Sequence, residues 1–441
     1  MAGEWPIATV ADGPLEIIDG DRGTNYPKQQ DFAPSGHCLF LNAGNVTTSG
    51  FNFSDCAFIS AEKDSALRKG KLRRHDIVLT TRGTVGNVAY FDEAVPYDHI
   101  RINSGMVIFR TQPQKLRARF LYLFLRSFLF QSQVESLRTG SAQPQLPIRD
   151  IYRIEIPIPP PDEQDTIAHI LGTLDDKIEL SGRMNETREA MAQALFKSWF
   201  VDFDPVRAKM EGRWRKGESL PGLPAHLYDL FPDSFEESEL GEIPRGWAVV
   251  PLPEMIEVNP TRSLRNGAVA PYLDMANMPT HGHSPHEVVE RAFSSGMRFI
   301  NGDTLVARIT PCLENGKAAF VDFLDEGQVG WGSTEYIVLR PRSPLPGEYA
   351  YCLVRSNEFR EFAMQSMTGS SGRQRVPAKS LSHYLLAVSP DNLAKQFGSI
   401  VKPLFVRAST AAGETRSLAA QRDILLPRLI SGNIQIHGGS E

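Results

Sequence analysis

Pro159-Pro160-Pro161-Asp162-Glu163-Gln164-Asp165 is the stretch that decides the fold, because it marks where an extended chain turns into a long helix. The three prolines hold the approaching backbone extended. Asp162 is placed to cap the helix, and Glu163 and Asp165 put negative charge at its positive N-terminal end. We therefore predict that a long helix begins here.

Apolar residues continue from this start at spacings of four and three, the pattern of a helix face that packs against a second helix. They are Ile167, Leu171, Leu174 and Ile178, and after polar breaks at Ser181, Asn185 and Arg188 they resume as Ala192, Leu195 and Trp199. Pro205 is expected to end this helix. A similar pattern runs from Phe397 to Leu429, where Pro403 is expected to kink the helix or mark its true start. Two such helices are expected to pack together.

The chain also contains a large internal repeat. Leu125-Arg126-Ser127 and Thr139-Gly140-Ser141 recur as Val354-Arg355-Ser356 and Thr368-Gly369-Ser370. Both pairs are displaced by 229 residues (354 − 125 and 368 − 139). A constant displacement of this length indicates duplication of a whole domain rather than a solenoid repeat.

Each half of the repeat has the pattern of an α+β domain, with short β-branched runs followed by one helix. The predicted strands are 77–80, 88–91 and 106–110 in the first half, and 304–308, 318–321 and 336–340 in the second. The predicted helices are 117–137 and 347–367. The two halves are therefore expected to share one architecture.

These patterns divide the chain into five parts. They are a first α+β domain (1–160), a first long helix (161–205), a linker with little regular structure (206–245), a second α+β domain (246–390) and a second long helix (391–436). The linker is predicted from its content of proline, glycine and charge.

Composition limits the function. The 441 residues, 41% hydrophobic and 22% charged, predict a folded protein of at least two domains. Four cysteines without a C-x-x-C pair, and no secretory signal or apolar run long enough to cross a bilayer, favour a cytoplasmic protein. The net charge of −5 argues against a protein that coats nucleic acid, and residues 1–160 (18 Lys+Arg, 16 Asp+Glu) are only slightly basic. Any basic surface must be local.

Several stretches resemble one known family. They are Ile156-Pro157-Ile158-Pro159-Pro160-Pro161-Asp162-Glu163-Gln164 with its continuation to Glu179, Lys197-Ser198-Trp199-Phe200-Val201-Asp202-Phe203, and the closing Leu425-Leu426-Pro427-Arg428-Leu429-Ile430-Ser431-Gly432. Together they resemble the specificity subunit of type I restriction-modification systems over nearly the whole chain. The second copy of the proline element is degraded to Ser389-Pro390-Asp391-Asn392-Leu393-Ala394-Lys395-Gln396.

The resemblance implies a fold and a function. It implies two similar α/β target-recognition domains, related by an internal pseudo-twofold repeat and separated by two long helices packed as an antiparallel coiled coil. Each domain would read one half of a bipartite site in double-stranded DNA. The chain would have no catalytic residue and would bind no cofactor or metal. It would position two modification (methyltransferase) subunits and the restriction (motor and nuclease) subunits, which use S-adenosylmethionine, ATP and Mg²⁺.

Base reading requires polar side chains on loops that enter the major groove. Both domains offer such loops, and we predict ten DNA-contacting residues on them. They are Arg82, Thr84, Ser141, Gln143 and Gln145 in the first domain, and Arg308, Ser333, Ser370, Arg373 and Arg375 in the second. The alternative for each is a turn or surface position, since turns also favour glycine and serine.

Two alternative functions remain open. A single-chain nuclease or methyltransferase would need motifs that are missing: Asn259-Pro260-Thr261 is only a fragment of an Asn-Pro-Pro-aromatic loop, and no phosphate-binding Gly-x-x-x-x-Gly-Lys loop exists. The nuclease-like string from Pro161-Asp162 to Asp175-Asp176-Lys177 falls on one predicted helix. A coiled-coil scaffold that ignores DNA sequence is disfavoured by the duplicated polar loops.

Three other features have structural and functional interpretations. Asp76 and Asp303 occupy equivalent positions before a strand, where turn chemistry is favoured over catalysis. His281, His283 and His286 are interpreted as a solvated loop rather than a metal site. Asp175, Asp176 and Glu179 are interpreted as a solvated helix face, although the resemblance implies that modification subunits dock in this region.

Overall fold

The computed structural model describes residues 5–140, 144–370 and 372–434. The chain forms two compact units, residues 1–178 with 417–441, and residues 179–416. Each unit contains one of the two predicted α+β domains together with one part of each long helix. The two units are described separately below.

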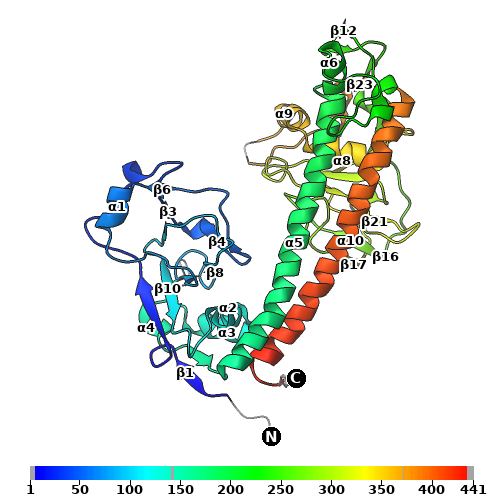
Figure 1. Ribbon diagram of the computed structural model, residues 1–441. Helices are drawn as coiled ribbons and strands as arrows, with labels where there is room; N and C mark the ends of the chain where they lie inside the picture. The colour runs from blue at the N-terminus through cyan, green and yellow to red at the C-terminus, as the bar shows by residue number, and fades with distance from the viewer. Residues whose placement is uncertain (1–4, 141–143, 371, 435–441) are drawn as a thin grey trace, which may run out of the picture. The chain divides into compact units, whose positions relative to one another are not determined.

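The first unit is built on a four-stranded antiparallel sheet (Figure 1). Its order is β2 (Leu15–Asp19), β10 (Met106–Thr111), β7 (Ile77–Thr80), β8 (Val88–Tyr90). Smaller sheets join β6 (Phe58–Ile59), β3 (Cys38–Phe40) and β9 (Ile100–Arg101), β4 (Val46–Thr47) with β5 (Gly50–Phe51), and β1 (Ile7–Thr9) with β11 (Glu155–Pro157). The helices are η1 (Gln29–Asp31), η2 (Ala43–Asn45), α1 (Ala61–Ala66), α2 (Ala118–Arg126), α3 (Phe128–Leu137) and α4 (Ile148–Ile151).

The second unit contains a four-stranded antiparallel sheet of the same design. Its order is β15 (Ile256–Val258), β22 (Tyr336–Pro341), β19 (Thr304–Ala307), β20 (Ala318–Phe320). Other sheets are β17 (Val289–Ala292), β16 (Val269–Leu273), β21 (Gly330–Gly332) and β18 (Met297–Phe299), then β14 (Ala248–Pro251) with β23 (Leu385–Val388), and β12 (Phe235–Ser238) with β13 (Gly241–Pro244). The helices are α6 (Asp204–Met210), η3 (Ala225–Leu230), α7 (Leu252–Met255), α8 (Gly347–Arg355), α9 (Asn357–Gln365) and η4 (Ala378–His383).

All six predicted strands are present within one residue of their expected ends. Both faces of the central strands are buried, which explains their continuous apolar runs. In the first unit Ile77 and Leu79 pack toward α2, whereas Val78 on the opposite face joins a second hydrophobic cluster. Val306 of the second unit packs with the α8 side, and Leu305 packs on the other face.

The single helix predicted in each domain is wrong, because each is broken at a serine. Ser127 separates α2 from α3 and Ser356 separates α8 from α9, both with extended backbone (ψ 158° and 151°). The Ser127 hydroxyl donates to the Phe124 carbonyl at 2.6 Å, and the Ser356 hydroxyl accepts the N–H of Phe359 at 3.2 Å. Serine thus offers the backbone an alternative to the helical hydrogen bond.

Two long helices of 40 residues each are present, α5 (Pro161–Phe200) and α10 (Asp391–Ile430). Helix α5 begins at Pro161, so Asp162 lies inside the first turn and is not the cap. It ends at Phe200, before Pro205, which instead occupies the first turn of α6, the position where its missing N–H costs least. Helix α10 continues through Pro403, which does not mark its start.

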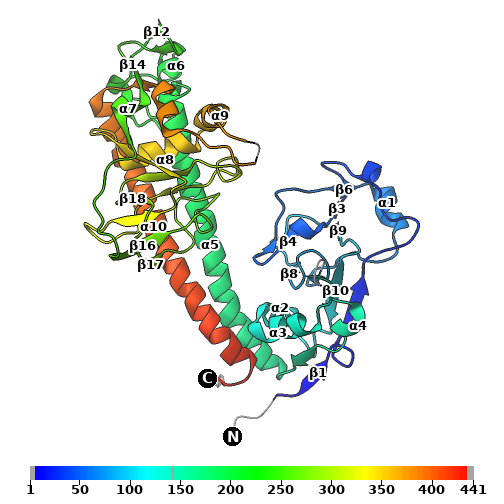
Figure 2. The ribbon, with the colours of Figure 1, turned by 180° about the vertical axis from the view of Figure 1, so that it is seen from behind.

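Within each unit the two long helices lie side by side (Figures 1 and 2), with residues paired in antiparallel order. In the second unit Asn185 donates to the Ala408 carbonyl at 3.0 Å, and Phe196 packs on Phe397. In the first unit Arg422 of α10 forms an ion pair with Asp175 of α5 at 2.9 Å. Several of the apolar residues that predicted these helices are buried, including Leu171, Trp199 and Phe397.

The segment 206–245 is not a linker with little regular structure. It contains α6, η3 and the hairpin of β12 and β13, and it buries the side chains of Trp214, Leu227 and Phe231 against Trp199 of α5. Its prolines, glycines and charges suggested a linker, but the aromatic residues between them supply enough apolar surface to fold onto the helix end.

Candidate nucleic-acid interface

In the first domain the structure brings the two predicted loops together. Arg82 follows β7 and Gln145 lies 63 positions later, yet they form an antiparallel bridge, and Leu146 N donates to the Thr81 carbonyl at 3.0 Å. Thr84 lies on the same exposed loop, its hydroxyl 3.5 Å from the Ala43 carbonyl. Ser141 and Gln143 lie outside the described residues. The loops therefore meet at one end of the central sheet.

The second domain repeats this arrangement. Ile309 bridges to Arg375, and Val376 N donates to the Arg308 carbonyl at 2.9 Å. The turn before β22 joins them, because Arg308 N donates to the Glu335 carbonyl at 2.9 Å, as Arg82 N does to Gly105 in the first domain at 3.2 Å. Segments distant in sequence thus meet in the same way in both domains.

Two of the predicted serines are less available for DNA contact than the predicted arginines. The hydroxyl of Ser333 already accepts the N–H of Glu335 at 3.1 Å, and Ser370 is an exposed turn residue whose carbonyl accepts from Arg373 N at 3.0 Å. Both residues match the turn interpretation that was left open for them. Arg373 is exposed, and its carbonyl accepts a hydrogen bond from Arg375.

Arg82 and Arg308 lie at the corresponding ends of their central sheets, one residue out of register, and lack charge partners. Among the described residues, neither guanidinium makes a hydrogen bond or ion pair. Arg82 is exposed, whereas Arg308 is half-buried and its Nε is a buried donor without a described partner. A cation that the fold holds without a counter-charge is suited to bind an external anion such as a phosphate.

A basic edge that the sequence analysis missed lies beside the first loop pair. Arg68, Lys69, Lys71, Arg73 and Arg74 are five cations within seven residues. This density of cations was the sequence signal for a local basic surface, although the domain as a whole is nearly neutral. Lys71 is committed to Asp64 and Arg74 to Asp98, whereas the side chains of Arg68, Lys69 and Arg73 have no described partner.

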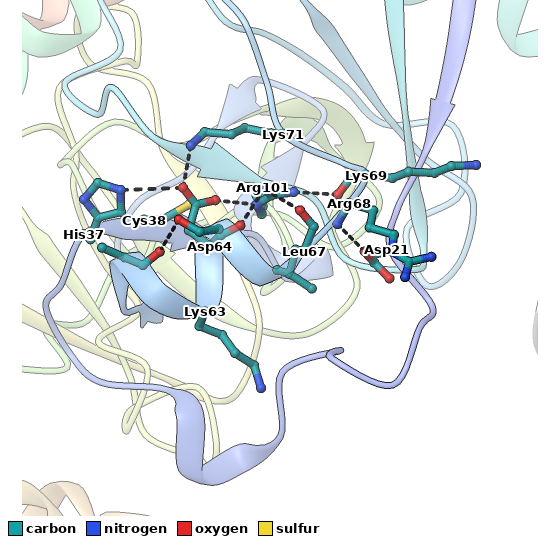
Figure 3. Close-up of polar contacts among 12 residues, drawn as sticks. Asp21, His37, Cys38, Lys63, Asp64, Leu67, Arg68, Lys69, Lys71 and Arg101 are labelled. Carbon is teal, nitrogen blue, oxygen red and sulfur yellow. Dashed lines mark hydrogen bonds and ion pairs between the residues drawn. The ribbon is translucent and has the colours of Figure 1, made fainter.

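A buried carboxylate fixes this edge (Figure 3). Asp64 of α1 accepts hydrogen bonds from Lys71 and from Arg101 of β9, with His37 at 3.5 Å. Burial alone would raise the pKa of Asp64, but these two cations outweigh it and lower the pKa to about 2. Arg101 also donates to the carbonyls of Lys69 (2.7 Å) and Leu67 (3.1 Å).

The result is a loop whose backbone is anchored while two cations remain outside. In Figure 3 the side chains of Arg68 and Lys69 point away from the Asp64 carboxylate. The N–H of Arg68 donates to Asp21 at 2.7 Å, and the neighbouring Arg22 donates to the Ser104 carbonyl at 3.4 Å. Ser104 adjoins Gly105, the partner of Arg82. The backbone at Arg68 is therefore linked through Asp21 and Arg22 to the turn that contacts Arg82.

The two aspartates at the start of the central strands are structural. Asp76 accepts the N–H of Arg73 and two bonds from Arg110, at 2.7–2.9 Å. Asp303 accepts the N–H of Ile300 at 2.9 Å and pairs with Arg340 at 2.6 Å. The favoured turn interpretation is confirmed. Each aspartate also pairs with an arginine, Arg110 or Arg340, which the sequence did not predict.

The solvated-loop interpretation is wrong for one of the three histidines. His281 and His286 are exposed, but His283 is 2% exposed and lies between Glu189 of α5 (2.6 Å) and Asp322 (3.2 Å). Within the described residues, no group of His, Cys, Asp and Glu side chains suited to hold a metal ion was found. The contact between His283 and Glu189 instead joins the histidine loop to α5.

The solvated-face interpretation holds for two of the three acidic residues on α5. Asp176 and Glu179 are exposed, with surface pairs to Arg119 and Arg183. Asp175 is largely buried and accepts from Arg126 (2.7 Å) and Arg422 (2.9 Å). The nuclease-like string from Asp162 to Asp176 lies entirely on α5, so its carboxylates do not converge from neighbouring strands.

Comparison with known proteins agrees with this geometry. The family model described as the type I restriction modification DNA specificity domain matches residues 16–188. The HindI type I specificity subunit of Haemophilus influenzae is 23% identical, with 94% of this chain and 98% of the relative covered. The MjaIX specificity subunit of Methanocaldococcus jannaschii is 25% identical over 85% and 81%.

Over most of its length the chain is similar to the specificity subunits of type I restriction-modification systems. The crystal structure of the S subunit from M. genitalium shares the fold of this chain, with a TM-score of 0.57, 15% identity and 96% coverage of both chains. Neither the scaffold alternative nor the single-chain enzyme is favoured by these similarities. No described helix of the chain is both long and apolar enough to cross a membrane.

Proposed function

We propose that this chain is a specificity subunit that reads a bipartite DNA site, one half with each α+β domain, and itself carries no catalytic residue. The observation that carries the proposal is the loop contact repeated in both domains. Arg82 bridges to Gln145, and Ile309, which follows Arg308, bridges to Arg375, each at the corresponding end of its own central sheet. Base edges are read by such side chains, and unpaired arginines hold phosphates.

The long helices would set the distance between the readers. A helix of 40 residues is about 60 Å long at about 1.5 Å per residue. We propose that α5 and α10 form one antiparallel coiled coil that relates the two domains by a pseudo-twofold axis. One DNA turn of about 34 Å fits within that length.

The basic edge would supply contacts of a different kind. Arg68 and Lys69 lie beside the loop pair of the first domain and have no described counter-charge. We propose that they bind DNA phosphates, which adds affinity and orientation without sequence preference.

Catalysis would belong to partner subunits. The chain would assemble with two modification subunits and with restriction subunits, and S-adenosylmethionine, ATP and Mg²⁺ would be bound by those partners. The exposed acidic face at Asp176 and Glu179 is available for such contacts, whereas Asp175 is committed to two arginines within its own unit.

Methylation mapping tests the proposal. The chain is co-expressed with its modification subunit, and adenine methylation is mapped across a plasmid by single-molecule sequencing. A split motif with a fixed gap is expected, and exchange of residues 1–160 for those of a relative should change only one half. A stable complex with an active modification subunit that methylates no defined motif would contradict the proposal.

A further inference from the structure

One predicted DNA-contacting position carries different residues in the two domains, which the repeat does not explain. Arg375 takes the place of Gln145, since both bridge to the equivalent threonines, Thr368 and Thr139. Glu335 takes the place of Gly105, since both precede the central strand and their carbonyls accept from the equivalent N–H groups of Arg308 and Thr81. The second domain therefore has an arginine and a glutamate where the first has a glutamine and a glycine.

Glu335 holds one side of the Arg375 guanidinium. Nε of Arg375 donates to both carboxylate oxygens at 2.9 Å, and Nη2 lies 2.8 Å from Oε1. Nη1 donates to the Arg373 carbonyl at 3.2 Å. Arginine has five N–H groups, so one on Nη1 and one on Nη2 remain unused. These two N–H groups form the end of the planar fork, and the side chain is 42% exposed.

A fork held in this way is suited to guanine. Guanine presents two acceptors, O6 and N7, in the major groove, and a bidentate arginine is their commonest partner. Fixing the guanidinium by its Nε side before DNA arrives lowers the entropy that binding costs. We propose that Arg375, oriented by Glu335, reads a guanine in the half-site of the second domain. The proposal rests on the proposed function of the chain.

Charge favours a base over a phosphate as the group that Arg375 binds. The carboxylate of Glu335 neutralises Arg375 and would repel a phosphate placed beside it. The same domain holds two other arginines, Arg308 and Arg373, whose guanidinium groups have no described carboxylate partner. Those two are better suited to the DNA backbone, which leaves the neutral guanine edge to Arg375.

Nucleotide analogues test this on the unaltered protein. The motif of the wild-type complex is mapped first, and the half read by the second domain is identified by domain exchange. Each guanine of that half is then replaced by 7-deazaguanine, which lacks N7, or by inosine, which keeps N7 and O6. We expect one position where 7-deazaguanine weakens binding by about tenfold or more and inosine has little effect.

Variants assign that position to Arg375. R375K keeps the charge without the fork, and E335Q keeps the shape without the anchoring charge, so both should relax the requirement for that guanine in the methylation motif. R373Q is the matched control, and it should lower methylation at all sites without changing the motif. A second half-site without guanine, no response to 7-deazaguanine, or an unchanged motif in R375K would overturn the inference. Absence of any motif in the wild type would instead overturn the proposed function.

Discussion

His283 Nδ1 lies 2.6 Å from Glu189 Oε1, and this contact joins a loop of the second domain to the middle of α5. Tyr351 of α8 donates to the other oxygen of Glu189 at 3.1 Å, and Arg355 donates to Tyr351 at 3.0 Å. The contact is therefore part of a buried polar network that fixes the domain to the long helix.

This network predicts a loss of stability at alkaline pH. Burial by itself would lower the pKa of His283, but hydrogen bonds to Asp322 and Glu189 raise it to about 9. Because the folded pKa exceeds the ordinary value of 6.5, the stabilisation is fully present below about pH 6.5 and is lost as the pH rises through about 9. H283Q should unfold more easily at pH 6, by about 3 kcal/mol, since it removes the positive charge that lies between the carboxylates of Glu189 and Asp322.

The measurement is thermal unfolding of wild type and H283Q between pH 6 and pH 10. The difference between the two proteins should shrink as the pH rises. H281Q is the control, because His281 is exposed, and it should match wild type. A difference that stays constant with pH would contradict the charged pair.

Asp64 predicts the opposite dependence in the first unit. Its folded pKa of about 2 lies below its ordinary value of 3.8, so its contribution is present above about pH 4 and is lost as the pH falls toward 2. D64N should destabilise the unit at pH 7 by about 2 kcal/mol. Urea unfolding at pH 7 and pH 3 measures this loss of stability. E62Q is the control, because Glu62 is exposed. An equal effect of D64N at both pH values would exclude the ion pair as the cause.

Asp175 and Asp176 are adjacent on α5 but should differ in their effect on stability. D175N leaves Arg126 and Arg422 facing each other without their shared carboxylate and should cost about 2 kcal/mol. D176N removes one exposed pair with Arg119 and should cost less than about 1 kcal/mol. Chemical denaturation of both variants checks this, and equal effects would mean that Asp175 is not a structural link between α5 and α10 in this unit.

The basic edge predicts a change in affinity without a change in sequence preference. R68Q combined with K69Q should weaken DNA binding by the methyltransferase complex and reduce the dependence of binding on salt by about one to two released ions. Binding is titrated at several salt concentrations, with K115Q as the control, because exposed Lys115 follows the opposite end of β10 from Gly105. An altered methylation motif in the double variant would show that these residues read bases.

Local patterns identified most elements because each depends on neighbours in sequence. Short β-branched and aromatic runs placed the strands 77–80 and 336–340, and the proline run placed the start of α5. The same reasoning failed at Ser127 and Ser356, where a serine hydrogen bond ends one helix and starts another inside a pattern that continues. It also failed at 206–245, whose aromatic residues fold only because α5 offers Trp199 to pack against.

The sequence by itself determined the duplicated α+β domains, the two long helices and the loops that carry Arg82, Gln145, Arg308 and Arg375, because spacing and turn chemistry are local properties. Only the tertiary structure decided which of these side chains are available. Arg375 is held by Glu335 from 40 positions away and His283 by Glu189 from 94, whereas Arg82 and Arg308 are left without a described partner. Ion pairs between distant segments depend on how strands and helices close around them, and no local pattern encodes that closure.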